Sequence, residues 1–298
     1  MENGSGAKGK KEKSRAFVLA EKSARALNPF NMGADATFHI LGSSSSGNCA
    51  LLETPGCRVL IDMGLPARKL NDLLHPLGKR LADVDAVFVT HEHSDHTCGL
   101  AGLARLPHVE VFANRETARA AQTRLRFRPK WNFFETGSTF SFRDIEVASF
   151  SIPHDASDPV GFVFSIAANA ATLRLAWCTD LGYVPELVRE RIRGVDVLVL
   201  ESNYDPDMLD RDHRRPWSLK QRIKSRHGHL SNHAAHELLS TTENASWRRV
   251  YLAHLSRECN DVQLVRETFA SLGKNGHRFA IEVVDPCTET ITCVLGAI

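Results

Sequence analysis

The chain has 298 residues and a formal net charge of +2, with 43% hydrophobic and 24% charged residues. This composition is typical of a globular protein, and it argues against a wholly disordered, fibrous or disulfide-stabilised chain. Histidine is the exception, because 14 histidines accompany only three tyrosines and four tryptophans, and histidine is both the commonest metal ligand and the usual acid–base group near neutral pH.

Residues 1–35 differ in composition from the rest of the chain. They are rich in Gly, Lys and Ala and hold seven Lys or Arg against four acids, a net +3. We predict a flexible basic arm here, with room for a short helix at 17–27. The early apolar run at 16–20 is too short for a signal core, and no uncharged stretch reaches the ~20 residues of a membrane span. Seven cysteines without a CxxC pair then favour a reducing, cytoplasmic setting with no membrane partner.

Residues 36–298 are predicted to form one domain. Short apolar runs between turn residues predict strands, and periodic apolar positions predict helices. The expected strands are 37–41, 49–53, 58–62, 84–90, 108–112, 139–150, 160–166, 172–177, 195–200, 248–253, 280–284 and 290–295. The expected helices are 66–77, 114–125, 185–192, 232–240 and 260–272. Strands come first and are then mixed with helices, twice over, which predicts an α+β fold of two packed sheets with helices outside.

The loop after strand 84–90 holds four candidate metal ligands within six residues. It reads Thr90-His91-Glu92-His93-Ser94-Asp95-His96. His91 and His93 are two residues apart and project to the same side of an extended backbone. Asp95 and His96 are adjacent and point differently, so one short loop can serve two neighbouring metals. Mixed nitrogen and oxygen ligands suit Zn²⁺, and also Mn²⁺ or Fe²⁺.

This HxHxDH loop resembles that of the metallo-β-lactamase superfamily. The resemblance implies a single-domain, four-layer αββα sandwich, in agreement with the predicted elements. It also implies that Asp62, at the end of a strand, orients the histidine loop. The implied ligands are His91, His93 and His154 for one metal, Asp95, His96 and His254 for a second, and Asp180 as a bridge between the two.

Further residues point to one branch of the superfamily. True metallo-β-lactamases usually hold Cys or Ser at the position of Asp180, so its presence implies a hydrolase or phosphodiesterase. Glu201 and His229 resemble the arrangement in ribonuclease Z, where a glutamate orients a histidine that protonates the leaving alkoxide, a step that phosphodiester hydrolysis needs. For His229 alone, a loop histidine without a role is an equally good interpretation.

Six segments are similar to the bacterial YycJ/WalJ (VicX) group of double-stranded-DNA exonucleases. They are LGSSSSGN (41–48), HEHSDH (91–96), LESNYD (200–205), PWSLKQRI (216–223), GHLSN (228–232) and AHLSRECN (253–260). The resemblance implies a 5′-to-3′ exonuclease acting on duplex ends, with links to mismatch repair. In that interpretation a hydroxide bridging two divalent metals, with Zn²⁺ favoured, attacks phosphorus, and His229, aligned by Glu201, is the general acid.

Two alternatives stay open at this point. The chain could be a metallo-hydrolase of a β-lactam, a lactone or a thioester, or an RNA-processing enzyme. It could also be a non-catalytic DNA-binding or regulatory module, although the complete ligand set argues against a vestigial site. The oligomeric state is not predicted.

Two basic runs are candidates for nucleic-acid contact, because neutralising phosphates supplies most sequence-independent affinity. Residues 210–226 hold seven bases against two acids, a local +5, and include Trp217. Residues 115–131 hold a second group of six bases, followed by Trp131. We favour the first run for DNA binding and interpret the second as a solvated helix face. The predicted contacts are Arg214, Arg215, Lys220, Arg222, Lys224 and Arg226.

Overall fold

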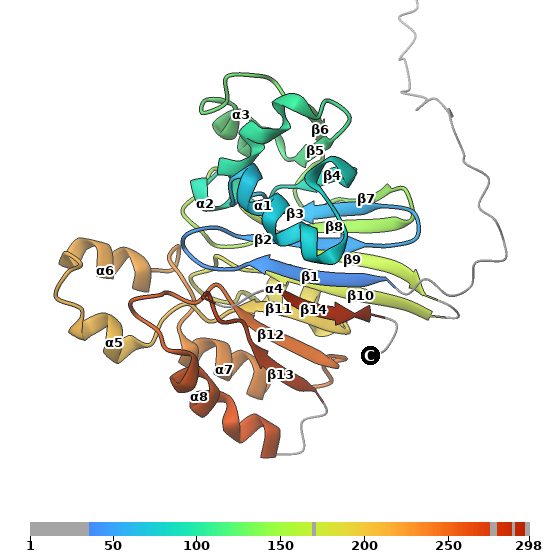
Figure 1. Ribbon diagram of the computed structural model, residues 1–298. Coiled ribbons are helices and arrows are strands. Elements are labelled where there is room, and N and C mark those ends of the chain that lie inside the picture. Colours follow the sequence, from blue (N-terminus) through green and yellow to red (C-terminus); the bar gives the residue numbers. More distant parts are fainter. Residues whose placement is uncertain (1–35, 169–170, 275–278, 288–289, 296–298) are drawn as a thin grey trace, which may run out of the picture. The chain divides into compact units, whose positions relative to one another are not determined.

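The computed structural model describes residues 36–168, 171–274, 279–287 and 290–295. The predicted arm at 1–35, with its possible helix, lies outside these ranges. The described residues belong to one compact unit, Ala34–Ile298, and they contain two seven-stranded sheets (Figure 1). Within the described ranges, every helix is too short or too polar to cross a lipid bilayer.

The first sheet combines an antiparallel part with a parallel part. Strands β1 to β3 form an antiparallel meander, β14 pairs antiparallel with β1, and β3 to β6 run parallel. In spatial order the strands are β14 (Ile291–Val294), β1 (Thr37–Gly42), β2 (Cys49–Glu53), β3 (Arg58–Ile61), β4 (Ala86–Phe88), β5 (Glu110–Ala113) and β6 (Lys130–Phe133). The helices of this half are α1 (Ala67–Leu74), η1 (His75–Leu77), η2 (Leu81–Asp83), α2 (Ser94–Thr97), η3 (Cys98–Arg105) and α3 (Arg115–Gln122).

The second sheet repeats this plan. Strands β7 to β10 are antiparallel, and β10 to β13 run parallel. In spatial order the strands are β13 (Ala280–Val283), β12 (Arg249–Ala253), β11 (Val197–Glu201), β10 (Ala171–Cys178), β9 (Val160–Ala168), β8 (Ile145–Ser151) and β7 (Thr139–Phe142). The helices of this half are α4 (Glu186–Arg193), α5 (Pro206–Arg211), α6 (Trp217–Lys224), α7 (Asn232–Thr241) and α8 (Val262–Lys274).

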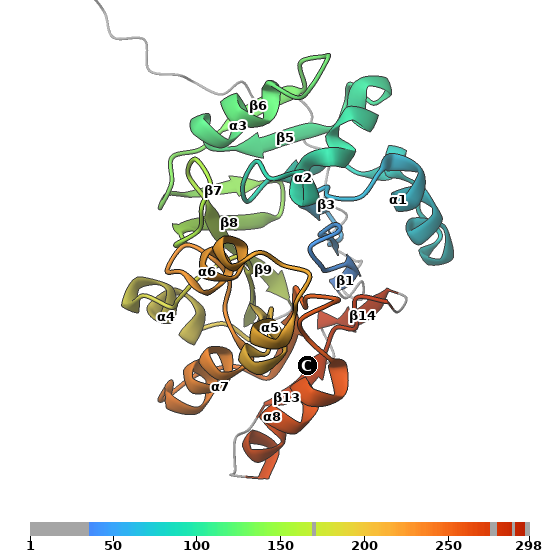
Figure 2. The ribbon, with the colours of Figure 1, turned by 90° about the vertical axis from the view of Figure 1, so that its left-hand side faces the viewer.

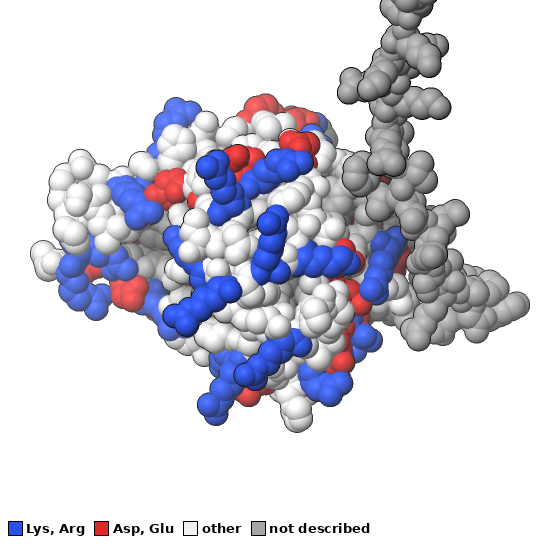
Figure 3. All heavy atoms as spheres, turned by 90° about the horizontal axis from the view of Figure 1, so that it is seen from above, with Lys and Arg blue, Asp and Glu red and all other residues white. Residues whose placement is uncertain are grey.

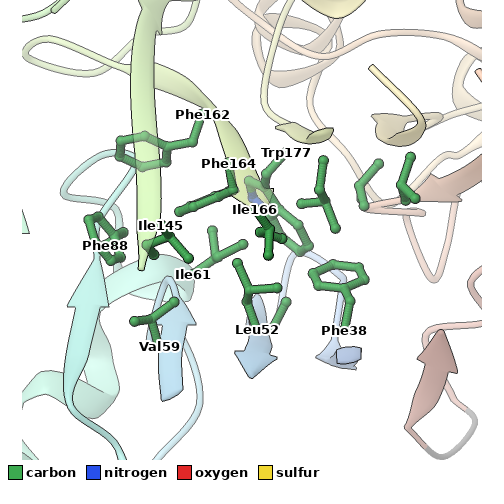
Figure 4. Close-up of a cluster of buried hydrophobic side chains, with 14 of the residues drawn as sticks. Phe38, Leu52, Val59, Ile61, Phe88, Ile145, Phe162, Phe164, Ile166 and Trp177 are labelled. Atoms are coloured by element: carbon green, nitrogen blue, oxygen red, sulfur yellow. The ribbon is translucent and has the colours of Figure 1, made fainter. Parts of the chain in front are cut away.

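Three hydrophobic layers hold the fold together. The inner faces of the two sheets meet in a central cluster, where Phe38 and Phe88 of the first sheet face Phe162, Phe164 and Trp177 of the second (Figure 4). Alternate residues of the same strands point outward, because successive side chains of a strand lie on opposite faces. Those residues pack against α1, η3 and α3 on one side and against α4, α7 and α8 on the other. The predicted four-layer sandwich is therefore confirmed.

One predicted strand is wrong in detail. Residues 139–150 form two strands, β7 and β8, joined by a tight turn at Arg143, which has φ = 52°. The sequence hides this turn because it holds no glycine or proline. A contact from a distant hairpin stabilises it instead, since the Asp144 carboxylate accepts hydrogen bonds from Thr54 Oγ1 and Gly56 N at 2.8 and 2.9 Å. Strand β6 and helices α5 and α6 are further elements that the sequence pattern did not predict.

The parallel parts of the two sheets place their carboxyl ends at one edge of the sandwich. The first sheet delivers Asp62 after β3 and the histidine loop after β4, and the second delivers Asp180, Glu201 and His254 after or at the ends of β10, β11 and β12. Figure 2 faces this edge, with α2 and α3 lying above α6. Ligand sites of open parallel sheets form at such strand ends, so this edge is where a functional site is expected.

Candidate metal centre

The structure brings together all seven predicted metal ligands. The ligand atoms of each group lie within 4.8 Å of one another. The first group joins two residues of the histidine loop to a residue after β8, and the second joins the other two residues of that loop to a residue after β12. The groups are His91, His93 and His154, and then Asp95, His96 and His254; Asp180 lies with His91 and His96, and also with His254.

The distances within each group suit a shared metal ion. In the first group His93 Nδ1 lies 3.1 Å from His91 Nε2 and 3.3 Å from His154 Nε2. Neighbouring ligands of a tetrahedral ion with bonds of about 2.0–2.1 Å are about 3.3 Å apart. In the second group Asp95 Oδ2 lies 3.6 Å from His96 Nε2 and 3.8 Å from His254 Nε2.

Asp180 lies between the two groups. Its Oδ2 is 3.1 Å from His96 Nε2, and its Oδ1 is 3.4 Å from His254 Nε2 and 3.8 Å from His154 Nε2. Despite these short distances, Asp180 Oδ2 and His254 Nε2 are buried and make no hydrogen bond with any described residue. Leaving such a buried atom unpaired costs about 1–3 kcal/mol. A divalent cation at this point would satisfy both atoms, so the residues fit a metal centre.

Hydrogen bonds on the outer ring nitrogens fix the orientation of three histidines. His96 Nδ1 lies 2.7 Å from Asp62 Oδ2, and His254 Nδ1 lies 2.8 Å from Glu201 Oε1. His154 Nδ1 donates to the carbonyl oxygen of Gly228 at 3.0 Å. Each contact aims Nε2 at the centre, and partners of this kind hold metal-ligating histidines in their tautomer and raise their basicity.

Asp62 connects the strand end to the histidine loop. Its Oδ1 accepts hydrogen bonds from Thr90 N at 2.8 Å and from Thr90 Oγ1 at 3.0 Å, and its Oδ2 contacts His96. The carboxylate is fully buried. Asp62 therefore positions both the start of the loop and one imidazole.

The backbone at the site is unusual. Five described residues other than glycine have positive φ, and three of them are Asp62, Asp180 and His254, at 59°, 60° and 57°. Each stands one or two residues beyond the end of a strand. The left-handed conformation there ends the up-and-down alternation of side chains that the strand imposes. Non-glycine residues in this region cost about 1–3 kcal/mol each and cluster at functional sites. Gly64 is also required, because a Cβ there would lie 1.6 Å from the carbonyl oxygen of Asp95.

The predicted pair Glu201 and His229 is in contact. Glu201 Oε1 lies 2.9 Å from His229 Nδ1, and its Oε2 accepts hydrogen bonds from the backbone N–H groups of Leu181 and Leu230 at 3.1 and 2.8 Å. Burial would raise the pKa of Glu201, but His229 and His254 outweigh burial and lower the pKa to about 2. The carboxylate is thus charged. Burial likewise disfavours the charged form of His229, yet Glu201 and Asp180 raise its pKa above the ordinary value.

A cavity of about 280 Å³ opens onto the centre. One wall holds α2 residues and Arg124, which follows α3, and the other holds residues of α6. His229 is part of the lining, its side chain is 23% exposed, and its Nε2 makes no hydrogen bond with a described residue. A substrate in this cavity would therefore meet both the metal ligands and a histidine nitrogen able to donate a proton.

The predicted nucleic-acid residues are spread around α6, and only Arg222 lines the cavity. Its guanidinium pairs with Asp155. Lys220 is buried, and its ammonium donates to the carbonyl oxygen of Asp210 at 2.8 Å. The remaining four, Arg214, Arg215, Lys224 and Arg226, lie on α6 or on the segments beside it.

Sequence reasoning missed residues that support the centre. Asn48 closes the serine-rich turn: its backbone N–H donates to Asp95 O at 2.7 Å, and its Nδ2 lies 3.0 Å from His96 Nε2. Ser43 Oγ accepts from the backbone N–H of His254 at 2.8 Å. Asn203 Nδ2 donates to His254 O at 2.8 Å. The GSSSSGN and LESN segments hold these residues, but composition and spacing carry no signal for such contacts.

Comparison with known proteins agrees with this geometry. Residues 57–255 match the Beta-lactamase superfamily domain. The chain is 35% identical over 260 residues to the protein named exodeoxyribonuclease YycJ of Bacillus anthracis, covering 85% of this chain and 97% of that one. It is also 35% identical over 238 residues to exodeoxyribonuclease WalJ of Streptococcus pneumoniae, covering 78% of this chain and 87% of the relative.

Solved structures show the same fold at much lower identity. The metallo-β-lactamase fold protein YhfI of Bacillus subtilis superimposes with a TM-score of 0.64 at 14% identity, covering 87% of this chain and all of that protein. At this level of identity the likeness concerns the arrangement of the sandwich, which agrees with the two packed sheets and their outer helices.

Proposed function

The chain belongs to the metallo-β-lactamase superfamily, and on that premise we propose that it is a metal-dependent exodeoxyribonuclease that digests duplex DNA from its ends in the 5′-to-3′ direction. The observation that carries the proposal is the 35% identity with exodeoxyribonucleases over nearly their whole length. The complete ligand set, five of whose seven members are buried, supports it, because a vestigial site would not keep seven ligands in place. A DNA substrate also agrees with the cytoplasmic location and the role in DNA repair expected from the sequence.

We assign two divalent metal ions to the centre, with Zn²⁺ favoured and Mn²⁺ or Fe²⁺ as alternatives. His91, His93 and His154 would hold one ion, and Asp95, His96 and His254 the other, with Asp180 as a ligand of both. Such ions lower the pKa of bound water to roughly 7 and stabilise the negative charge that develops on a phosphodiester.

His229, oriented by Glu201, would protonate the leaving group. Phosphodiester cleavage releases an alkoxide, which leaves poorly unless it is protonated, and a positioned acid contributes about 10²–10⁴-fold. His229 fits this task because Glu201 binds its Nδ1 and leaves Nε2 facing the cavity. The charged Glu201 carboxylate favours the protonated imidazole, so His229 can hold the proton until the leaving oxygen takes it.

Digestion of end-labelled DNA tests the proposal. The purified protein is loaded with Zn²⁺ or Mn²⁺ and incubated with 5′- and 3′-labelled linear duplex, single-stranded DNA and covalently closed circles. We expect metal-dependent release of label from the 5′ end of the duplex and no cut in the circle. Turnover of nitrocefin or an acyl lactone, with all DNA left intact, would overturn the proposal.

Two variants connect the activity with the centre. Asp180→Asn should abolish DNA digestion and lower the metal content, because it removes charge from a ligand shared by both ions. Asp72→Asn is the matched control, since Asp72 is exposed on α1, outside the centre, and its replacement should leave both properties unchanged. Full activity of Asp180→Asn would refute the assignment of the site.

A further inference from the structure

The two basic runs carry the same formal charge, so the sequence alone does not decide which one meets DNA. We call residues 210–226 the α6 run and residues 115–130 the α3 run; each has a net charge of +5, as seven bases minus two acids and six bases minus one acid. Phosphate binding depends on cations that are free to replace counterions. The useful quantity is therefore the number of cations without a carboxylate partner in the folded protein.

The α6 run is largely neutralised by its surroundings. Arg222 pairs with Asp155, and Lys224 pairs with Asp210. Arg214 and Arg215 share Asp212, and Arg215 also contacts Glu258 at 3.0 Å; Arg211 lies 3.9 Å from Asp207. Five of its seven cations thus face carboxylates.

The last two cations of the α6 run have other contacts. Lys220 is buried and its Nζ donates to a backbone carbonyl. The Arg226 guanidinium lies over the Tyr183 ring, 4.1 Å from its centroid. Arg226 is thus the one exposed cation of the described α6 run that meets no described carboxylate. The charge count that favoured this run in the sequence therefore overstates the charge that it offers to phosphate.

The α3 run has the opposite character. Arg115 lies 4.0 Å from Glu135, and Lys130 lies 3.2 Å from Glu110. The other four cations make no ion pair within 4.0 Å in the part of the chain that the structure describes, and all four are exposed. We call these four the arginine patch: Arg119, Arg124, Arg126 and Arg128.

The turn after α3 holds the patch in place. Exposed arginines at 124, 126 and 128 alternate with Leu125 and Phe127, which pack against the hydrophobic cluster of the first sheet. Gln122 fastens the turn, because its Nε2 donates to Phe127 O at 2.8 Å and its Oε1 accepts from Trp131 Nε1 at 3.0 Å. The arginine backbones are thus ordered before any ligand arrives, which lowers the entropic cost of binding.

One member of the patch reaches the metal centre. Arg124 lines the cavity and its Nη1 donates to the carbonyl oxygen of Glu92 at 3.0 Å, whereas Arg128 borders a separate hollow beside Leu103 and Leu106. Figure 3 looks down on the side of the fold that carries α3 in Figure 1, and Lys and Arg side chains run across the middle of this face. Arg124 is therefore the member of the patch that a substrate in the cavity would meet first.

We propose that the arginine patch binds the phosphate backbone of duplex DNA beside the cavity and that the α6 run does not supply this binding. The inference rests on the proposed function, since it assigns the surface that holds the substrate of that site. The patch makes no base-specific contact in this proposal, so binding is independent of sequence and depends strongly on salt.

Salt-dependent binding separates the two runs. The test variant is Arg119→Gln/Arg126→Gln/Arg128→Gln, which keeps Arg124 in the cavity. The matched control is Arg191→Gln/Arg248→Gln/Arg266→Gln, because these three arginines are also exposed and form no ion pair with a described residue, and they lie in the second-sheet half. Both variants lose three charges. The probe is a blunt duplex whose phosphorothioate ends resist digestion. Its affinity for each metal-loaded protein is measured at salt concentrations from about 50 to about 200 mM.

The patch variant should bind the duplex about 10- to 100-fold more weakly than the wild type. The negative slope of log K against log salt should become shallower by about 2.7, at roughly 0.9 per lost contact. The control should match the wild type. Equal affinity of patch variant and wild type, or equal losses in patch variant and control, would overturn the inference. Thermal unfolding and metal content show that each variant is folded. Absence of DNA hydrolysis by the wild type would instead refute the proposed function, whatever the binding results.

Discussion

The two basic runs on either side of the cavity have the same formal charge in the sequence but present different surfaces in the folded protein. On the α6 side, acidic residues from several elements meet five of the seven cations, and His229, with its partner Glu201, lies next to this wall. On the α3 side, four exposed arginines make no ion pair with any carboxylate of the described residues. We infer that the α6 side carries proton transfer and that the α3 side holds the phosphate backbone. The comparison teaches that a local charge count predicts binding only after the partners of each cation are known.

Replacement of the proposed acid should have the largest effect. His229→Ala should lower kcat on duplex DNA by about 10²–10⁴-fold, because the leaving oxygen loses its proton donor. A phosphodiester with a nitrophenol leaving group needs less help from a proton donor, so its kcat should fall less in this variant. His227→Ala, two residues away and exposed, is the control. Loss of bound metal from His229→Ala would show that His229 is a ligand and would remove the proton-transfer role from this wall.

Removal of the Glu201 charge should have the next largest effect. Glu201→Gln keeps the shape of the side chain but weakens the orientation of His229 and His254, and such partners are worth about 10–100-fold in metal affinity or activity. We expect kcat to fall while KM for duplex stays the same, because Glu201 does not touch the substrate. A rise in KM alone would contradict this positioning role. Glu237→Gln, on the exposed face of α7 outside the centre, serves as the control.

A single substitution on the opposite wall should affect binding instead. Arg124→Gln should raise KM for duplex DNA about tenfold with little change in kcat, because one phosphate contact at the cavity is lost. The loss should shrink as salt increases. Arg191→Gln removes an exposed arginine of α4 and should change neither constant. A fall in kcat as large as that of His229→Ala would place Arg124 in the chemical step and erase the difference between the walls.

The smallest effect is a gain. Asp210→Asn removes the partner of Lys224 and should strengthen duplex binding about two- to threefold. A freed cation that contacts a phosphate should also steepen the negative slope of log K against log salt by roughly 0.9. The ion pair is partly exposed, so the free energy of unfolding should change by only about 0–1 kcal/mol. Asp72→Asn, on α1, removes an exposed carboxylate elsewhere and controls for net charge. Unchanged DNA binding by Asp210→Asn would show that ion pairs with carboxylates are not the reason why the α6 run does not bind DNA.

Much of the fold could be predicted because its signals are local. Alternating and continuous apolar runs indicated most strands, and the strands-then-helices order indicated two sheets. The turn at Arg143 could not be found, because Thr54 and Gly56, about 90 residues earlier, hold Asp144. Strand β6 is short, with half-exposed and exposed residues, and α5 and α6 lie in a charged stretch without a clear apolar period. Such elements are stabilised by their neighbours more than by their own pattern.

The sequence by itself determined the set of candidate metal ligands and their order, because His91, His93, Asp95 and His96 stand in one loop and the resemblance assigned His154, Asp180 and His254. It did not determine how Asn48, Ser43 and Asn203 support that centre. Only the tertiary structure decided which cations are free. Arg222 meets Asp155 from 67 residues away, and Arg215 meets Glu258 from 43 residues away. Coulomb attraction acts through space, so the fold, and not the spacing along the chain, sets the charge that a substrate encounters.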